Sequence, residues 1–257
     1  MNYGSKIFDY ETEIGLDKIP DTFPYFVSGE NTVVSTSQNV FINDVSTANP
    51  NGIPIALLTN AIQFKVSSTS NNDTSGGTGA RNVYLTGIAI INNVWTYTSE
   101  FVTLNGQTEV LTSNSYIRLL KCEAYSVGSL GVQDGDIYIG TGVVTNGIPA
   151  TEYGKIRSDR GAMKSSLLTI PDGYKGLLKQ FIINIDSNKT NEIYLKTKSS
   201  STSKVTRVHF TLDTTQNVIN LVSYFAIPQR TDLWIEAKSI AQTSNVKVGL
   251  VFTLHKI

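Results

Sequence analysis

The residue types that most often carry catalysis are sparse in this chain, and their spacing matches no catalytic motif. The sequence has two histidines and one cysteine. His209 and His255 each lie in an alternating run typical of a strand, and neither has a neighbour that would complete a catalytic dyad. Cys122 lies in the strand-like run 116–125 with no histidine nearby, which indicates a buried structural thiol. We therefore expect no catalytic residue and no enzyme.

Metal and phosphate motifs are also missing. The glycine-rich segment 76–80 lacks the Gly-Lys-[Ser/Thr] ending of a phosphate-binding loop. No His-Glu-x-x-His or Cys-x-x-Cys pair is present for zinc. Asp134 and Asp136 could offer two oxygens to calcium, but the rest of an EF-hand loop is absent, and a tight turn at the start of a strand explains the same residues. We expect neither a metal nor a cofactor.

The charge balance disfavours nucleic acid as a partner. The chain has 21 basic and 21 acidic residues, so its formal net charge is zero and no basic field attracts a phosphate backbone. No apolar run approaches the roughly 18 residues of a membrane helix. The first ten residues lack the apolar core of a signal peptide. We expect no membrane partner and synthesis in a cytoplasm without secretion.

The elements that must carry any site are strands. From about residue 55 apolar and polar residues alternate with a period of two, and the alternation is longest over 246–254. Asn105-Gly106 between two such runs predicts a hairpin, and Pro171-Asp-Gly173 predicts a turn. Roughly 13 or 14 strands with turn signals every 8–12 residues are typical of a sandwich. The predicted fold is all-β, a jelly-roll-like antiparallel sandwich.

Two arrangements of these strands remain open, either two small sandwiches in tandem or one large one. The sequence predicts an extended N-terminal arm over 1–50 and a first sandwich half or domain over 51–145. Clustered Gly and Pro residues predict a linker or crossing loop over 146–164, and a second half or domain follows over 165–257.

Several aromatic residues are candidates for an interface with other proteins. The arm is rich in aromatic side chains that need a surface to bury them, either on their own domain or on a neighbouring subunit. Trp234 lies in opposite phase to Leu233 and Ile235, which predicts a side chain on the outer face, either an interface anchor or packed under a loop. The candidate interface residues are Phe8, Tyr10, Phe23, Tyr25, Phe26 and Trp234.

Two groups of turn-and-strand motifs carry a resemblance to a known class of proteins. The first consists of Gly76-Gly-Thr-Gly-Ala-Arg-Asn-Val-Tyr-Leu-Thr-Gly87, Glu100-Phe-Val-Thr-Leu-Asn-Gly106, Tyr116-Ile-Arg118 and Gly135-Asp-Ile-Tyr-Ile139. The second consists of Ile170-Pro-Asp-Gly-Tyr-Lys-Gly-Leu177 and Ile227-Pro-Gln-Arg-Thr-Asp-Leu-Trp-Ile-Glu-Ala237. This succession resembles virion structural proteins of aquatic viruses, both tailed phages and large algal-type viruses.

The resemblance implies a non-enzymatic virion protein with a β-sandwich fold, such as a penton, minor capsid, decoration or head-fibre protein. Its partners would be other capsid proteins and copies of itself, as a trimer or pentamer. The alternative is a carbohydrate- or receptor-binding module of a virion fibre, with a glycan stacked on Trp95, Tyr97, Tyr224 or Trp234. Ordinary sheet packing explains Trp95 and Tyr97 equally well. A sandwich hydrolase or lyase would need carboxylates or histidines clustered in one pocket.

Overall fold

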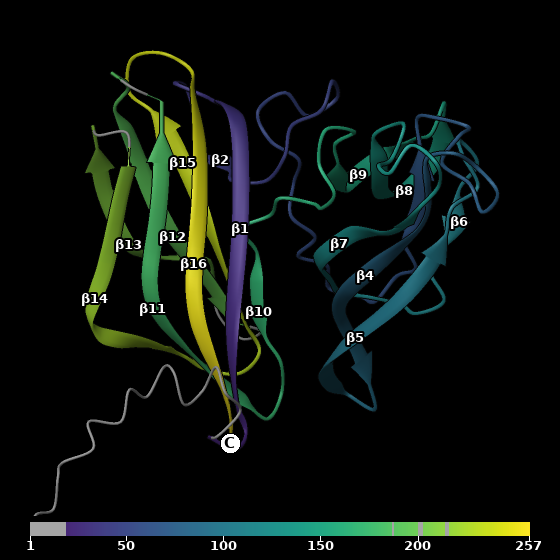
Figure 1. Ribbon diagram of the computed structural model, residues 1–257. Helices are drawn as coiled ribbons and strands as arrows, with labels where there is room; N and C mark the ends of the chain where they lie inside the picture. The colour runs from purple at the N-terminus through teal and green to yellow at the C-terminus, as the bar shows by residue number, and fades with distance from the viewer. Residues whose placement is uncertain (1–18, 187, 200–202, 214–215) are drawn as a thin grey trace, which may run out of the picture.

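A computed structural model describes residues 19–186, 188–199, 203–213 and 216–257, and this part of the chain is all-β (Figure 1). The described residues contain no helix, and so none that is long and apolar enough to cross a membrane. The strands are β1 (Thr22–Val34), β2 (Val40–Phe41), β3 (Lys65–Ser68), β4 (Ala80–Ile91), β5 (Val94–Thr103), β6 (Val110–Leu111), β7 (Arg118–Val127), β8 (Ile137–Thr145), β9 (Ile148–Ile156), β10 (Leu168–Ile170), β11 (Tyr174–Ile185), β12 (Asn191–Ser199), β13 (Val205–Leu212), β14 (Gln216–Ile227), β15 (Thr231–Ser239) and β16 (Ser244–Lys256).

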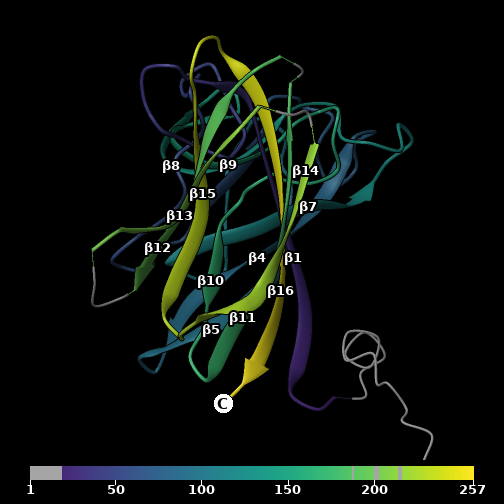
Figure 2. The same ribbon diagram turned by 90° about the vertical axis from the view of Figure 1, so that its left-hand side faces the viewer.

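The strands form antiparallel sheets that pack in pairs around two cores. The orders β1-β16-β11-β14 and β10-β15-β12-β13, with β2 also paired to β15, belong to one pair, which we call the C-terminal body. The orders β6-β3-β8-β9 and β5-β4-β7 belong to the other, which we call the central body. The two bodies lie side by side in Figure 1, and Figure 2 views the molecule from the side of the C-terminal body.

The central body is inserted within one strand position of the C-terminal body. β2 and β10 lie end to end along the same edge of β15, since β2 pairs with Glu236 and Ala237 and β10 pairs with residues 231–233. Ile42 lies between them: its N–H donates to the carbonyl of Ile235 (3.1 Å), and its own carbonyl accepts from the N–H of Ser166 (3.0 Å). The chain therefore leaves and re-enters the C-terminal body at adjacent points.

Alternating apolar side chains build the core of the C-terminal body. The predicted alternation over 246–254 is confirmed, because Val246, Val248, Leu250, Phe252 and Leu254 are all buried there. Strands in which every second residue is apolar bury one face and leave the other for polar groups. The C-terminal strand β16 pairs with β1 on one side and with β11 on the other, which holds the end of the chain in the sheet.

The N-terminal arm predicted over 1–50 contains a long strand instead, because Thr22–Val34 is β1. Polar residues in its middle hide the period-two signal. Glu30 is buried and forms ion pairs with Arg160 and Lys247. The buried Asn31 amide donates to two backbone carbonyls, so these polar groups are inside because they have partners. Phe8 and Tyr10 lie outside the described residues.

The linker predicted over 146–164 contains strand β9. Asn146 and Gly147 have positive φ values of 51° and 79°, the geometry of a two-residue type I′ turn that joins β8 to β9 as a hairpin. The expected hairpin around Asn105-Gly106 is wrong. A turn is present there, but β5 and β6 belong to different sheets, so the chain turns a corner of the sandwich.

Cys122 lies fully buried in the core of the central body, as expected. Burial raises the pKa of its thiol well above the usual range, because a thiolate would be desolvated there. We predict that Ellman's reagent does not modify the native protein at pH 8 and modifies one thiol per chain after unfolding in urea. Rapid labelling of the native protein would contradict a closed core.

Candidate functional site

The most distinctive arrangement of side chains is the junction between the two bodies. Its apolar part is a cluster to which the central body contributes Ile88, Ile117 and Leu120, and the C-terminal body contributes Leu167 and Trp234. Trp234 faces outward from its own sandwich, as its phase predicts, but it is only 1% exposed. The surface that covers Trp234 belongs to the same chain, so this candidate interface residue anchors an intramolecular contact.

A buried ion pair crosses the junction next to Trp234. The Arg118 guanidinium of β7 donates two hydrogen bonds of 2.7 Å to the two carboxylate oxygens of Asp232 in β15. The side chains are 5% and 1% exposed. Arg118 also donates to the carbonyls of Leu58 and Ile117, and Asp232 accepts from the Thr169 hydroxyl. Both charges are thus paired and hydrogen-bonded, which a buried ion pair requires.

A second ion pair fastens the tip of the β4–β5 hairpin. The Arg230 guanidinium donates two hydrogen bonds of 2.7 Å to Asp172, and a third to the carbonyl of Asn93. The backbone N–H of Trp95 donates to the same Asp172 carboxylate (2.7 Å). Hydrogen bonding from Arg230 lowers the pKa of Asp172. Asp172 and Arg230 therefore hold the tip of the hairpin through hydrogen bonds to its backbone.

Two tyrosines complete the junction. The rings of Tyr25 in β1 and Tyr97 in β5 stack at 6.2 Å, and the Tyr97 hydroxyl donates to the carbonyl of Thr169 (2.9 Å). Burial raises the pKa of both phenols. Among the other arm aromatics, Phe23 and Phe26 remain 46% and 60% exposed.

Three of the six stretches that carry the sequence resemblance meet at this junction. Arg118 ends the Tyr116-Ile-Arg118 motif, and Asp172 belongs to the stretch 170–177. Arg230, Asp232 and Trp234 belong to the stretch 227–237. Their shared role in the structure is to fix one body on the other.

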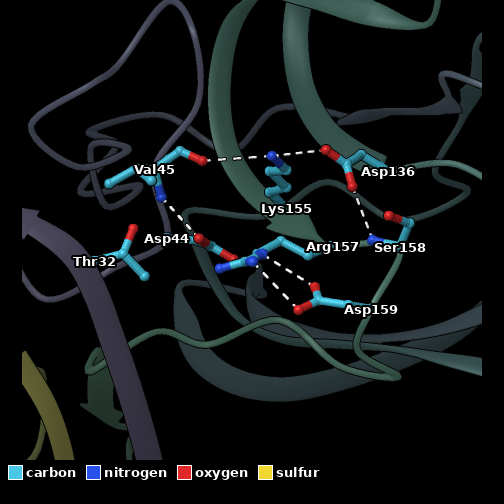
Figure 3. Close-up of a pocket in the computed structure, with 8 residues that line it drawn as sticks. All are labelled: Thr32, Asp44, Val45, Asp136, Lys155, Arg157, Ser158 and Asp159. Carbon is cyan, nitrogen blue, oxygen red and sulfur yellow. Dashed lines mark hydrogen bonds and ion pairs between the residues drawn. The ribbon is translucent and has the colours of Figure 1, made fainter. Parts of the chain in front are cut away.

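A polar cavity of about 530 Å³ lies between β1, the segment after β2 and the strands β8 and β9 (Figure 3). The Lys155 ammonium lies 2.7 Å from Asp136, and Arg157 lies 3.0 Å from Asp159. Burial raises the pKa of Asp44, whose carboxylate accepts the N–H of Val45. Lys155 thus neutralises the carboxylate of Asp136, and Arg157 neutralises that of Asp159. Such paired charges are typical of a structural contact between chain segments.

The acidic and histidine residues considered for chemistry are not brought together. The Asp134 carboxylate accepts hydrogen bonds from the side chains of Ser70 and Asn72, whereas Asp136 forms an ion pair with Lys155. Both carboxylates therefore have protein partners in the turn before β8. In the described part of the chain, no three His, Cys, Asp or Glu residues are grouped as metal ligands. His209 stacks on Tyr194 in sheet β10-β15-β12-β13, and His255 contacts Thr22 in the opposite sheet.

A surface that the sequence did not single out is an aromatic patch on the outer face of the sheet β5-β4-β7. We call Tyr84, Phe101 and Tyr125 the aromatic triad. The ring centroid of Phe101 lies 4.9 Å from that of Tyr84 and 4.6 Å from that of Tyr125. Phe101 is 54% exposed and Tyr125 is 63% exposed. The outward phase of Tyr84, between the buried Val83 and Leu85, was the signal available in the sequence.

No protein-family model and no curated protein matches this chain. Among solved structures, the structure of infectious bursal disease virus strain Gx is 8% identical, with a TM-score of 0.22 over 91% of this chain and 71% of that chain. The structure of strain Gt is 9% identical, with a TM-score of 0.19 over 92% of this chain and 74% of that chain. The crystal structure of the VP2 subviral particle of infectious bursal disease virus is 9% identical, with a TM-score of 0.17 over 92% of this chain and 75% of that chain. The chain therefore has weak structural similarity to viral capsid proteins.

Proposed function

We propose that the chain is a non-enzymatic structural component of a virus particle, which assembles in the virion with other capsid proteins and with copies of itself. The connectivity of the C-terminal body supports this. With β2 and β10 taken as one position, its strands in chain order switch between the sheets β1-β16-β11-β14 and β10-β15-β12-β13 at every step except from β12 to β13, which are neighbours in one sheet. We interpret this order as a jelly roll made of two Greek keys, an architecture that recurs in viral capsid domains and also in lectins and cupins.

In this proposal the central body is a second domain inserted in the second strand of the jelly roll. The buried pair Arg118–Asp232, the pair Asp172–Arg230 and the cover over Trp234 hold the two domains in one orientation. A fixed orientation suits a shell component, because closed symmetric assembly requires subunits of constant shape.

We assign self-association to the edge strand β1. No described strand pairs with the second edge of β1, and the exposed Phe23 and Phe26 lie on it. The ring of Phe26 packs over Gly249, where an added Cβ would come within 2.9 Å. Pro24 and the buried Glu30 limit the stretch of edge that is open to pairing, as natural edge strands require.

The solution mass tests this proposal. By size-exclusion chromatography with light scattering, we expect a discrete trimer or pentamer for the full chain. Phe26→Asp, which places a charge on the face of the sheet beside the open edge, should shift the mass toward the monomer with little change in the melting temperature. Val143→Asp, on an exposed side chain of β8, is the matched control. A full chain that stays monomeric at every soluble concentration would contradict self-assembly.

The contribution of the N-terminal segment needs a deletion that leaves β1 intact. Deleting residues 1–30 would remove most of β1 and with it the pairing to β16. A chain that begins at residue 19 retains the strand. If the segment ties neighbours together, this chain folds normally and assembles less well than the full chain. Unchanged assembly would refute that role.

The alternative function, binding of a carbohydrate or receptor, is not supported at the residues first considered for it. Trp234 is buried, and Trp95 and Tyr97 are half-buried in the junction. The side chain of Tyr224 lies outside those that the structure describes. A glycan site therefore has to be sought on other aromatic side chains.

A further inference from the structure

The outer face of the sheet β5-β4-β7 is divided into two parts. One part, which includes Ile88, Trp95 and Tyr97, is covered by the C-terminal body of the same chain. The aromatic triad continues the same face beyond this contact and is open to solvent, since Phe101 and Tyr125 are each more than half exposed. Two large rings exposed side by side on a rigid sheet indicate a binding surface.

Two hydroxyl side chains and one ion pair border the triad. Thr86 and Ser99 are opposite each other on β4 and β5, and their hydroxyls lie 3.0 Å apart. Lys121 is opposite Thr86, and Glu123 is opposite Tyr84 on β7. The Glu123 carboxylate thus lies in the same cross-strand row as Tyr84 and Phe101, and one residue pair further along the strands lies a row of hydroxyl and ammonium groups from Ser99, Thr86 and Lys121.

We propose that the aromatic triad, with Thr86, Ser99, Lys121 and Glu123, binds a neutral oligosaccharide. The apolar C–H face of a pyranose stacks on the electron-rich faces of the rings. Its hydroxyl groups, which both donate and accept, reach the neighbouring polar row. A few polar groups beside an apolar platform fix the orientation of such a ligand.

The charges on the face favour a neutral sugar over a protein or a charged ligand. Lys121 and Glu123 form an ion pair of 2.8 Å, so their charges cancel and the face attracts neither anions nor cations. Their side chains are 51% and 32% exposed. A protein docked on the triad would bury this pair at a desolvation cost, whereas the hydroxyl groups of a glycan, which donate and accept, can hydrogen-bond both charges in place of water.

Titration with hexasaccharides of glucose, mannose, galactose and N-acetylglucosamine tests the site, with calorimetry on the full chain as the readout. We expect at least one hexasaccharide to bind. Phe101→Ala and Tyr125→Ala should each weaken binding about ten-fold, the equivalent of roughly 1.4 kcal/mol. Phe101→Leu, which keeps apolar area but has no ring, should weaken it similarly. Val143→Ala, an exposed side chain of the same body, should bind as the unmodified protein does.

Four outcomes would overturn the proposal. Three concern binding: no binding of any hexasaccharide at millimolar concentration, binding that both ring variants retain, and full retention in Phe101→Leu. The fourth is a changed solution mass of Phe101→Ala without a sugar response, which would assign the face to a second copy. Because assembly is measured by mass and sugar binding by heat, the two proposals can fail separately.

Discussion

Replacing Arg118 with alanine lowers the free energy of unfolding by about 3–5 kcal/mol, since the change strands a buried carboxylate. Asp232 is 1% exposed, and the Arg118 guanidinium donates two of its three 2.7 Å hydrogen bonds while the Thr169 hydroxyl donates the third. Water cannot replace the cation without opening the junction. Urea denaturation followed by tyrosine and tryptophan fluorescence measures the effect.

Matched variants separate the effect of the unpaired charge on stability from the effect of losing the contacts of the Arg118 side chain. Arg118→Met together with Asp232→Leu removes both charges and keeps apolar volume, and should recover most of the lost stability. Lys65→Ala removes the exposed pair with Glu109 and should leave the unfolding midpoint nearly unchanged. If Arg118→Ala is as mild as Lys65→Ala, the junction is hydrated and the two bodies are only loosely joined.

Trp234→Ala should also lower the free energy of unfolding by about 3–5 kcal/mol, because it leaves a cavity at the centre of the junction cluster. The Glu236 carboxylate would lose the hydrogen bond that it accepts from the indole N–H (3.0 Å), and the Lys204 ammonium would lose the ring whose centroid lies 5.4 Å away. Calorimetric unfolding measures the loss, and Trp234→Phe should retain part of the stability.

The same variant distinguishes an internal anchor from an intermolecular one. Under conditions where Trp234→Ala remains folded, its oligomeric mass should equal that of the unmodified chain, because the covering surface is intramolecular. Val143→Ala provides the exposed-site control for stability, with an expected change within about 0.5 kcal/mol. Dissociation of a folded Trp234→Ala oligomer would show that the indole contacts a neighbouring subunit.

Period-two patterning predicts much of the fold but not its connectivity. It predicts an all-β chain, the inward face of β16 and the outward phase of Trp234, because these depend only on local alternation. It does not predict that β2 and β10 share one edge of β15, since Ile42 and Ser166 meet with the whole central body between them. The long-range partners that bury Glu30 in β1 are likewise invisible in the local pattern.

The candidate sites divide in the same way. The outward phases of Trp234 and Tyr84 can be predicted from their buried neighbours on β15 and β4. The sequence gives no sign of which outward ring is covered. The packing of one body on the other decides that, and it buries Trp234 while Phe101 and Tyr125 stay open. Sequence reasoning therefore identifies aromatic side chains on outer faces but not the accessible ones.

The chain leaves the C-terminal body after Ile42 and re-enters it at Ser166, and these two residues are hydrogen-bonded to each other. The central body is therefore an insertion that another domain could replace. A different domain would join two residues that are already hydrogen-bonded without altering the sheet order of the C-terminal body. The surface of the inserted body could then diversify while the sheets of the C-terminal body stay constant. A replacement domain would still have to cover Trp234 and supply a cation for Asp232, so these two residues define which replacements are compatible.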